Sequence, residues 1–361
     1  MSYAAAVWFA AQEEVEKEER VNIPRLSFDD FDDDFIFKHF HFTRPAINFI
    51  IDYTRAHLNH PPSVHSVDAM VLAALCLYAN GSLTKEIADM IGLSEVAISR
   101  AVHIVSALLS DKAEDFITFP NGYNDRVLLA QEIQRFCGMP NVVGVLGCMH
   151  VRIKPPPGEE IRYLNFMGHY STMFQMICDS QGNLLSVENQ WPGSTSEQNV
   201  WESSKICQQF KSGRHGHSWL IGASSYSLDK HVLTPLSYVR ERTSIRYNEA
   251  HFKIGSAIQK TFCALKTRFR CLDNLGNIQK YTYNKPAEIV NACCVLHNIA
   301  MKFSIALPGK LVPEPVYHGI NRQELTQGGS DMLLFREEMI KAFFSQDSDN
   351  VLGFPSSFEM A

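Results

Sequence analysis

The chain has 361 residues, of which 45% are hydrophobic and 11% aromatic, and its formal net charge is −6. This length and composition predict a soluble globular protein with room for two domains. No apolar run approaches the roughly 20 residues needed to cross a bilayer, and the first 20 residues lack a basic n-region and a clear cleavage site, so we expect neither a membrane association nor secretion.

The nine cysteines are scattered along the chain and include no CxxC pair. This pattern is typical of buried free thiols in a reducing compartment rather than of disulfides. We therefore expect a protein of the nucleus or the cytoplasm.

Acidic residues concentrate at the two ends. Residues 1–36 hold ten acids and three bases, residues 311–361 hold eight acids and three bases, and the middle of the chain holds 21 acids and 27 bases. We predict an acidic N-terminal tail (1–36) and an acidic, partly disordered C-terminal tail (305–361). Within the middle, residues 240–280 carry nine bases and three acids. They either form a surface that meets phosphates or solvate a helix face.

In chain order, "FDDFDDDF" (28–35) predicts a linker or a short docking helix. Apolar residues then recur three or four apart from residue 47 to residue 109, which predicts a helical domain over 37–120. Inside it, "SLTKEIADMIGLSEVAISRAVHIV" has the shape of a helix-turn-helix. Its first helix should begin near Thr84, Gly92 should supply the left-handed turn residue, and Ser94 should cap the second helix.

If the second helix reads the major groove, its outward side chains would contact DNA. We place Glu95, Ser99, Arg100 and His103 on that outward face. An ordinary helical hairpin explains the same pattern, and a single basic residue on the face argues against a strong autonomous reader.

Strands and helices follow a helix at about 125–137. We predict strands in "VVGVLGCMHVRI", "TMFQMICDSQGNLLSVENQW" and "SWLIGASSYSL", the middle one a hairpin that turns at residues 179–182, and helices at 199–210, 248–272 and 286–303. Their order predicts a mixed α/β sheet covered by helices over residues 121–304, with one late helix near 332–344. Gly147, in the middle of the first strand, indicates a bulge, a close backbone approach or a lost side chain.

Six segments in this order resemble the Harbinger family of DDE transposases, and more closely the domesticated, transposase-derived nucleases of this family in vertebrates. They are "NVVGVLGCMHVRIKPP", "YLNFMGHYSTMFQMICDSQG", "VENQWPGSTSEQNVWESS", "SWLIGASSYSLDKHVLTPL", "RYNEAHFKIGSAIQKTFCALKTRFRCLD" and "IVNACCVLHNIA". The resemblance covers residues 37 to 304. It implies an RNase H-like catalytic-type domain preceded by an all-α helix-turn-helix domain.

The resemblance also implies an active site of two aspartates and one glutamate that holds two divalent metals, Mg²⁺ or Mn²⁺. Two such ions about 4 Å apart repel by roughly 16 kcal/mol at an effective dielectric constant near 20, so carboxylate ligands are needed. The three family positions fall on Gly147, Ala223 and Gln259. All three carboxylates are absent, so the resemblance implies that Gly147 marks a lost side chain in an otherwise intact strand. It therefore predicts a degenerate site, no cofactor and no catalysis.

Other groups are poor replacements. Cys148 with His150, and Cys293 and Cys294 with His297, lack tetrahedral zinc spacing. The remaining acids that could bind one metal weakly are Asp179, Glu197 and Asp229.

The predicted function is that of a nuclear, transposase-derived DNA- or protein-binding factor. The resemblance implies a Myb/SANT-type DNA-binding protein as the partner, and direct DNA contact and a homo-oligomer are left open. Two alternatives are a scaffold that docks this partner without touching DNA and a residual metal-dependent nuclease. The candidate DNA-contacting residues are Ser99, Arg100, His103, Lys260, Lys266, Arg268 and Arg270.

Overall fold

The computed structural model describes residues 28–58, 66–82, 91–281, 286–311 and 329–345. Its central sheet has five strands in the order β3-β2-β1-β4-β5. The strands are β1 (Val142–Arg152), β2 (Ser171–Cys178), β3 (Leu184–Pro192), β4 (Trp219–Ile221) and β5 (Val232–Leu233).

The strands β1, β2 and β3 form an antiparallel meander, and β4 and β5 run parallel to β1. The predicted mixed α/β fold of RNase H-like type is confirmed by this order. Strand β5 was not predicted, because its two residues are too short to show any periodicity.

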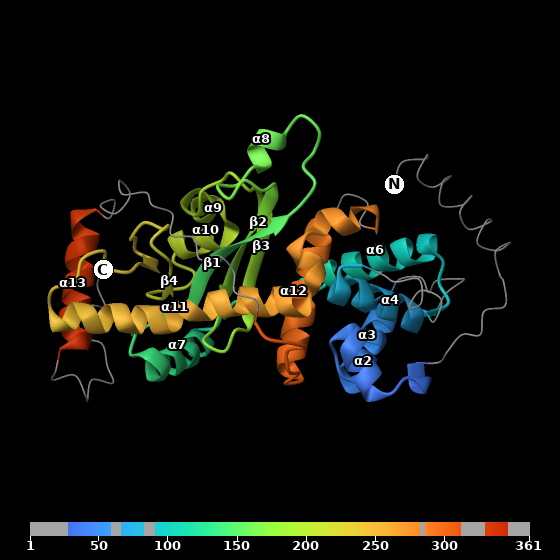
Figure 1. The fold of residues 1–361 in the computed structure, drawn as a ribbon. Coiled ribbons are helices and arrows are strands. Elements are labelled where there is room, and N and C mark those ends of the chain that lie inside the picture. Colours follow the sequence, from blue (N-terminus) through green and yellow to red (C-terminus); the bar gives the residue numbers. More distant parts are fainter. Residues whose placement is uncertain (1–27, 59–65, 83–90, 282–285, 312–328, 346–361) are drawn as a thin grey trace.

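Helices cover both faces of the sheet, as Figure 1 shows. On one face, α9 (Glu197–Ser203) and α10 (Lys205–Lys211) pack Trp201 and Phe210 against Leu146. The sequence predicted one helical segment here. The structure divides it at Ser204, whose extended backbone ends α9 and whose hydroxyl accepts from the Cys207 N–H to cap α10.

On the other face lies α11 (Arg242–Arg268), with α7 (Tyr123–Cys137) beside it. The predicted late helix is also present. It is α13 (Ser330–Phe344), and it packs on the start of α11 and buries Met339, Ile340 and Phe344. Part of the segment assigned to the C-terminal tail therefore belongs to the folded core.

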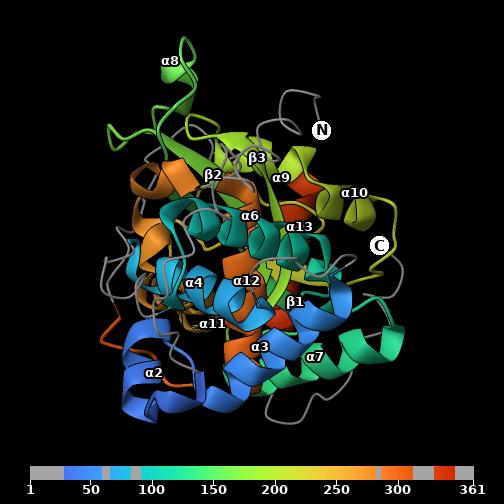
Figure 2. The ribbon, with the colours of Figure 1, turned by 90° about the vertical axis from the view of Figure 1, so that its right-hand side faces the viewer.

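The N-terminal region is helical throughout its described part. Its helices are α2 (Asp33–Phe40), α3 (Arg44–His57), α4 (Val67–Asn80) and α6 (Glu95–Asp111), and α12 (Pro286–Lys302) lies between them and the sheet (Figures 1 and 2). Short pieces complete the fold: α8 (Glu160–Tyr163) and the 3₁₀ turns η1 (Phe28–Asp30), η2 (Ala113–Asp115), η3 (Arg270–Asp273) and η4 (Leu275–Tyr281).

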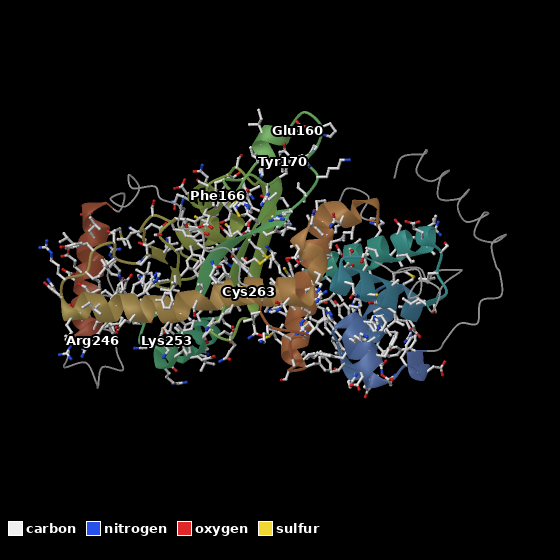
Figure 3. All side chains as sticks on the ribbon, in the orientation of Figure 1. Glu160, Phe166, Tyr170, Arg246, Lys253 and Cys263 are labelled. Carbon is white, nitrogen blue, oxygen red and sulfur yellow. The ribbon has the colours of Figure 1, made fainter. Side chains whose placement is uncertain are left out.

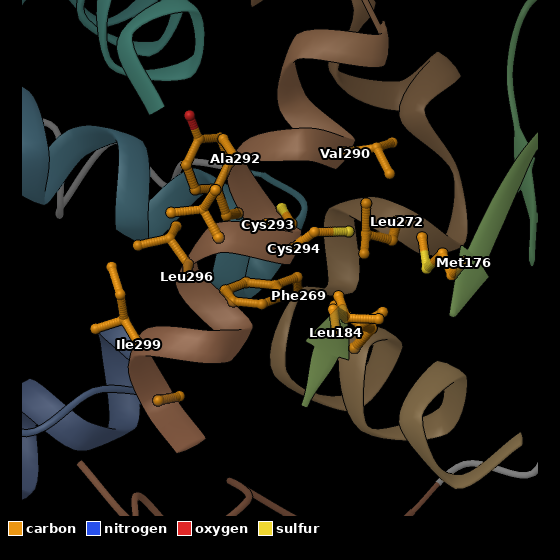
Figure 4. Packing of buried hydrophobic residues seen from close by; sticks show 14 of the residues in the cluster. Met176, Leu184, Phe269, Leu272, Val290, Ala292, Cys293, Cys294, Leu296 and Ile299 are labelled. Carbon is orange, nitrogen blue, oxygen red and sulfur yellow. The ribbon is translucent and has the colours of Figure 1, made fainter. Parts of the chain in front are cut away.

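One hydrophobic core joins the helical region to the sheet. Cys293, Cys294 and Leu296 of α12 are buried together with Phe269, which ends α11 (Figure 4). Helix α12 also contacts α6, and the Tyr78 hydroxyl of α4 lies 2.6 Å from the Ser106 hydroxyl of α6. The domain boundaries proposed from sequence therefore cross a continuous core. None of the described helices is both long enough and apolar enough to cross a bilayer.

Candidate functional site

The structure brings the three degenerate positions together. Strands β1 and β4 are parallel, and Val145 pairs with Ile221. Two residues further along each chain stand Gly147 and Ala223, so the two positions lie side by side at the carboxyl end of this strand pair.

Helix α11 supplies the third position. Ile258 of α11 lies under Gly147, and Gln259 follows it directly. Earlier on the same helix, the His251 Nε2–H donates to the Gly222 carbonyl over 3.1 Å, next to Ala223. Helix α11 therefore crosses below both strands, and Gln259 lies beside the two strand positions.

Apolar side chains occupy the space beside Gly147. A β-carbon built on this glycine would lie 2.9 Å from Ile258 Cγ1 and 3.4 Å from Phe262 Cε2. Ile258 is branched at Cβ and buried, so it has little freedom to move aside. The strand is intact at Gly147, which pairs in register with Met176, and helix α11 approaches it closely. This packing agrees with the lost side chain that the resemblance implies, because Ile258 occupies the space beside Gly147.

Asp179 and Asp229 each form hydrogen bonds within the turn in which they lie. The Asp179 carboxylate accepts from the backbone N–H groups of Gln181 (2.8 Å) and Asn183 (2.9 Å) in the β2–β3 turn. The Asp229 carboxylate accepts from the backbone N–H groups of His231 (2.6 Å) and Val232 (2.8 Å) before β5. Both are the side chain to backbone bonds that stabilise tight turns.

Glu197 lies close to the degenerate position Ala223. Its carboxylate accepts a hydrogen bond from the Ser225 hydroxyl, two residues after Ala223. Burial raises the pKa of the Glu197 carboxyl, and the bond from Ser225 only partly opposes this.

The residues present do not fit the metal pair that the resemblance implies. The three positions offer no carboxylate, and the space for one at Gly147 is taken by Ile258. Within the described ranges, no group of three or more His, Cys, Asp or Glu side chains lies close enough to hold a metal ion. Asp179, Asp229 and Glu197 instead form separate local hydrogen bonds.

The cysteine and histidine groupings are also held by local bonds. The Cys148 thiol lies 3.5 Å from the Tyr226 hydroxyl, and burial raises its pKa well above the ordinary value. The His150 ring lies 3.0 Å from the Ser171 hydroxyl, and burial beside Lys266 lowers its pKa to about 4. His297 Nε2 donates to the Gly182 carbonyl over 3.0 Å. Neutral, buried groups of this kind stabilise the fold.

The basic residues at the end of α11 divide into two classes. Lys260 and Arg270 are exposed, and half-buried Lys266 donates to the His150 carbonyl over 3.1 Å. Arg268 does not belong to this surface, and its place among the DNA-contacting candidates was wrong. It is 2% exposed, and its guanidinium donates to the carbonyls of His41, Ile305 and Ala306.

The expected recognition helix is partly packed into the protein. Gly92 has the predicted left-handed backbone (φ 72°), and the Ser94 hydroxyl accepts from the Ala97 N–H to cap α6, as predicted. The outward orientation of Ser99 was wrong, because this residue is 9% exposed where α6 packs against α4 and α12.

Of the three other side chains of that face, Glu95 is exposed, whereas Arg100 and His103 are half-buried. His103 lies 3.6 Å from Glu288 of α12, and Arg100 is only partly exposed. The predicted first helix of the motif, near Thr84, lies outside the described residues. Burial of this face makes it a weaker candidate for reading a groove.

One feature was missed by the sequence reading. Between β1 and β2 the chain projects from the sheet as an arm (155–170) that carries α8 (Figure 3). Its large apolar side chains are exposed, including Ile161 (86%) and Phe166 (68%). The three consecutive prolines at 155–157 were the available signal, because they end β1 and stiffen the chain that leaves it.

Comparison with known proteins agrees with this geometry. A family model described as DDE superfamily endonuclease matches residues 146–298. The chain is 35% identical over 333 residues to "Putative nuclease HARBI1" of Homo sapiens, covering 90% of this chain and 94% of that protein. It is 37% identical to the Bos taurus protein of the same name, covering 81% of this chain and 85% of that protein.

A more distant match extends to plants. "Protein ALP1-like" of Arabidopsis thaliana is 21% identical over 72% of this chain and 69% of that protein. No solved structure matches the chain significantly.

Proposed function

Because the chain belongs to the Harbinger-derived family of DDE superfamily nucleases, we propose that it is a domesticated transposase derivative that binds nucleic acid without cutting it. We place it in the nucleus, where it would meet DNA, the nucleic acid that we propose it binds. A Myb/SANT-type DNA-binding protein is the partner that we propose for it.

The main support for a loss of catalysis is the packing of apolar side chains beside Gly147. A metal pair requires several carboxylates around two close cations, since their mutual repulsion must be offset. Here glycine, alanine and glutamine occupy the three positions, and Ile258 and Phe262 close the space beside the first. Loss of the carboxylates is thus accompanied by apolar packing, which supports a site that no longer assembles.

DNA binding is supported by the charge that remains. Removal of three acidic side chains makes this face less repulsive to phosphates. Exposed Lys260 and Arg270, with half-buried Lys266 between them, follow the degenerate position Gln259 along α11 and its end. We assign the phosphate contacts to these three residues.

The slope of log affinity on log salt tests the assignment. Each phosphate contact to duplex DNA should contribute a slope of about −0.9, so loss of two contacts should flatten it by about 2. We expect this flattening in the double variant Lys266→Glu, Arg270→Glu. A wild-type chain that binds no duplex at about 50 mM salt, or a slope unchanged in the variant, would reject DNA binding through this surface.

A second candidate function, protein docking without DNA contact, is favoured by the projecting arm. Contiguous exposed apolar side chains on a soluble surface commonly mark protein interfaces. The arm presents Ile161, Leu164, Phe166 and Tyr170, all more than 40% exposed.

A pull-down from nuclease-treated nuclear extract tests the arm. The double change Ile161→Ser, Phe166→Ser should abolish capture if the arm docks a protein. The matched control is Tyr123→Ser, which removes an equally exposed aromatic (76%) from α7. Equal loss of capture in the control, or retained capture in the arm variant, would exclude the arm.

A further inference from the structure

A polar cavity lies away from the degenerate site, where the N-terminal helices meet the end of α11. Its volume is about 320 Å³. The residues that line it are Phe37, Lys38, His39, His41, Asn80, Arg270 and Pro308. They include two permanent cations, two histidines and an amide, and no acidic side chain.

Four separate parts of the chain build this cavity. The end of α2 supplies Lys38, the end of α4 supplies Asn80, and Arg270 opens η3. The cavity is therefore assembled only when the N-terminal helices dock on the rest of the protein. Neither the charge count nor any sequence motif could have revealed it.

The two cations at the rim are available. Lys38 and Arg270 are exposed, and within the described ranges neither side chain forms a hydrogen bond or an ion pair. Two unpaired cations that converge on one cavity without a counter-charge raise its electrostatic potential.

The ends of α2 and α4 would ordinarily repel an anion, because the last carbonyls of a helix carry partial negative charge. Here some of these carbonyls already accept hydrogen bonds. The His41 N–H donates to the Phe37 carbonyl over 3.0 Å, and the Gly81 N–H donates to the Leu77 carbonyl over 2.9 Å. The Asn80 amide donates to the His39 carbonyl over 2.9 Å. These bonds reduce the negative partial charge that an anion would meet there.

Arg268 fixes the wall of the cavity from behind. The His41 Nδ1–H donates to the Arg268 carbonyl over 2.7 Å, and the Arg268 guanidinium returns a 2.7 Å bond to the His41 carbonyl. This reciprocal pair holds the ring of His41, which is 5% exposed, with Nδ1 engaged. Only Nε2 of His41 remains free to gain a proton or to meet a ligand.

We propose that this cavity binds a tetrahedral oxyanion of the phosphate class, held by Lys38 and Arg270 with His39 and His41 behind them. Guanidinium and ammonium groups are the usual partners of phosphate oxygens, and an acid-free lining excludes a metal cation. The ligand is either a DNA backbone phosphate or a free phosphorylated molecule. The proposal does not depend on DNA binding by the chain.

The histidines give the site a pH signature. Burial lowers the pKa of His41, and Arg270, Arg268 and His39 lower it further, although its bond to the Arg268 carbonyl acts in the opposite direction. Burial and Lys38 lower the pKa of His39. A bound dianion would offset these positive neighbours and favour protonation of both rings. Anion affinity should therefore rise as pH falls.

Calorimetric titration of the full chain with inorganic phosphate at pH 7 tests the site. We expect saturable binding of one phosphate, about tenfold weaker in Arg270→Gln and in Lys38→Gln, since each loses a charge-assisted bond. The control Lys230→Gln removes an exposed lysine outside the cavity and should bind phosphate as the wild type does. Sulfate, which does not titrate in this range, should bind more tightly at pH 5.5 than at pH 8.

A 20-base-pair duplex distinguishes the two sources of phosphate. If the duplex competes with inorganic phosphate in the wild type, the site holds the DNA backbone. If phosphate binds unaffected by the duplex, the site holds a free phosphorylated ligand. Absence of phosphate binding, or binding equal in Arg270→Gln, Lys38→Gln and the wild type, would overturn the proposal.

Discussion

The middle of α11 and its C-terminal end differ in what they retain. In the middle, Ile258 and Phe262 press against Gly147, and the remaining polar residue of the former site, Gln259, is half-buried. At the end, Arg270 is exposed and shares an acid-free cavity with Lys38. The middle of α11 has apolar packing where the family has charged side chains, whereas its C-terminal end has kept exposed basic side chains.

This difference separates chemistry from binding. Phosphodiester cleavage requires carboxylates and metals in one place, and the loss of one ligand defeats it. Phosphate binding is distributed over many basic side chains and survives the loss of any one of them. A transposase derivative under no demand to cut is therefore expected to lose the middle of α11 first.

Restoring a carboxylate at Gly147 should have the largest effect. Gly147→Asp should lower the free energy of unfolding by about 3–5 kcal/mol, because it forces Ile258 aside and buries a charge without a partner. Gly147→Ala, which adds volume without charge, should cost about 1–3 kcal/mol. Urea denaturation measures both. An aspartate variant as stable as the wild type would show that room for the ancestral side chain persists.

Replacement of Arg268 should have the next largest effect on stability. It tests whether the end of α11 carries one buried and one exposed cation. Arg268→Gln leaves the carbonyls of His41, Ile305 and Ala306 short of donors and should cost about 3 kcal/mol. The matched variant Arg270→Gln, two residues on, should stay within about 0.5 kcal/mol of the wild type. Equal losses would mean that the end of α11 is not divided into buried and surface cations.

Acid should weaken the middle of α11 through His251. Burial lowers its pKa to about 4, while its bonds to the Gly222 and Leu233 carbonyls oppose this. Between pH 6.5 and 4 the unfolded chain binds a proton that the folded chain does not, so stability is lost as pH falls through this window.

The difference between the wild type and His251→Gln isolates this contribution. From pH 7 to pH 4 the wild type should lose about 3 kcal/mol more than the variant. Parallel curves of unfolding free energy against pH would exclude His251 as the titrating group.

Charge reversal on the exposed end of α11 should act on binding alone. Lys266→Glu with Arg270→Glu should leave the free energy of unfolding, measured in urea, within about 0.5 kcal/mol of the wild type, apart from the loss of the Lys266 bond to the His150 carbonyl. It should weaken DNA binding by at least about tenfold at low salt. An unaltered affinity would reduce this surface to a solvated helix end.

The smallest effect is expected at α6. Arg100 is half-buried beside a face on which Ser99 is packed away, so it has little access to a groove. Arg100→Ala should change DNA affinity by less than about threefold, since a working base contact would cost about 1–3 kcal/mol. Loss of sequence preference in this variant, measured on paired duplexes, would show that α6 does read DNA.

The sequence was most informative where a run of apolar residues predicted an element and the order of the elements matched the family. Strand β1 and the β2–β3 hairpin were predicted from runs of apolar and β-branched residues and from turn residues, and the three degenerate positions came from the resemblance. Their proximity, however, depends on the register of β1 with β4 and on α11 crossing below both, which are tertiary facts.

The errors share one physical cause. Ser99 and Arg268 were both assigned to surfaces from helical spacing alone, which does not say which neighbouring element covers a face. Helix α12, about 190 residues after α6, packs against the helix that carries Ser99, and the chain near Ile305 accepts hydrogen bonds from Arg268. The cavity at Lys38 and Arg270 escaped for the same reason, because its walls come from opposite ends of the chain.

The central claim, binding without cleavage, is tested most directly by a nicking assay on supercoiled plasmid with Mg²⁺ and with Mn²⁺, run alongside a binding assay on the same preparation. We predict a shifted plasmid and no nicked or linear product at any protein concentration. Metal-dependent nicking that co-elutes with the chain through successive columns, and that changes in Gln259→Ala, would show that the degenerate site still cuts.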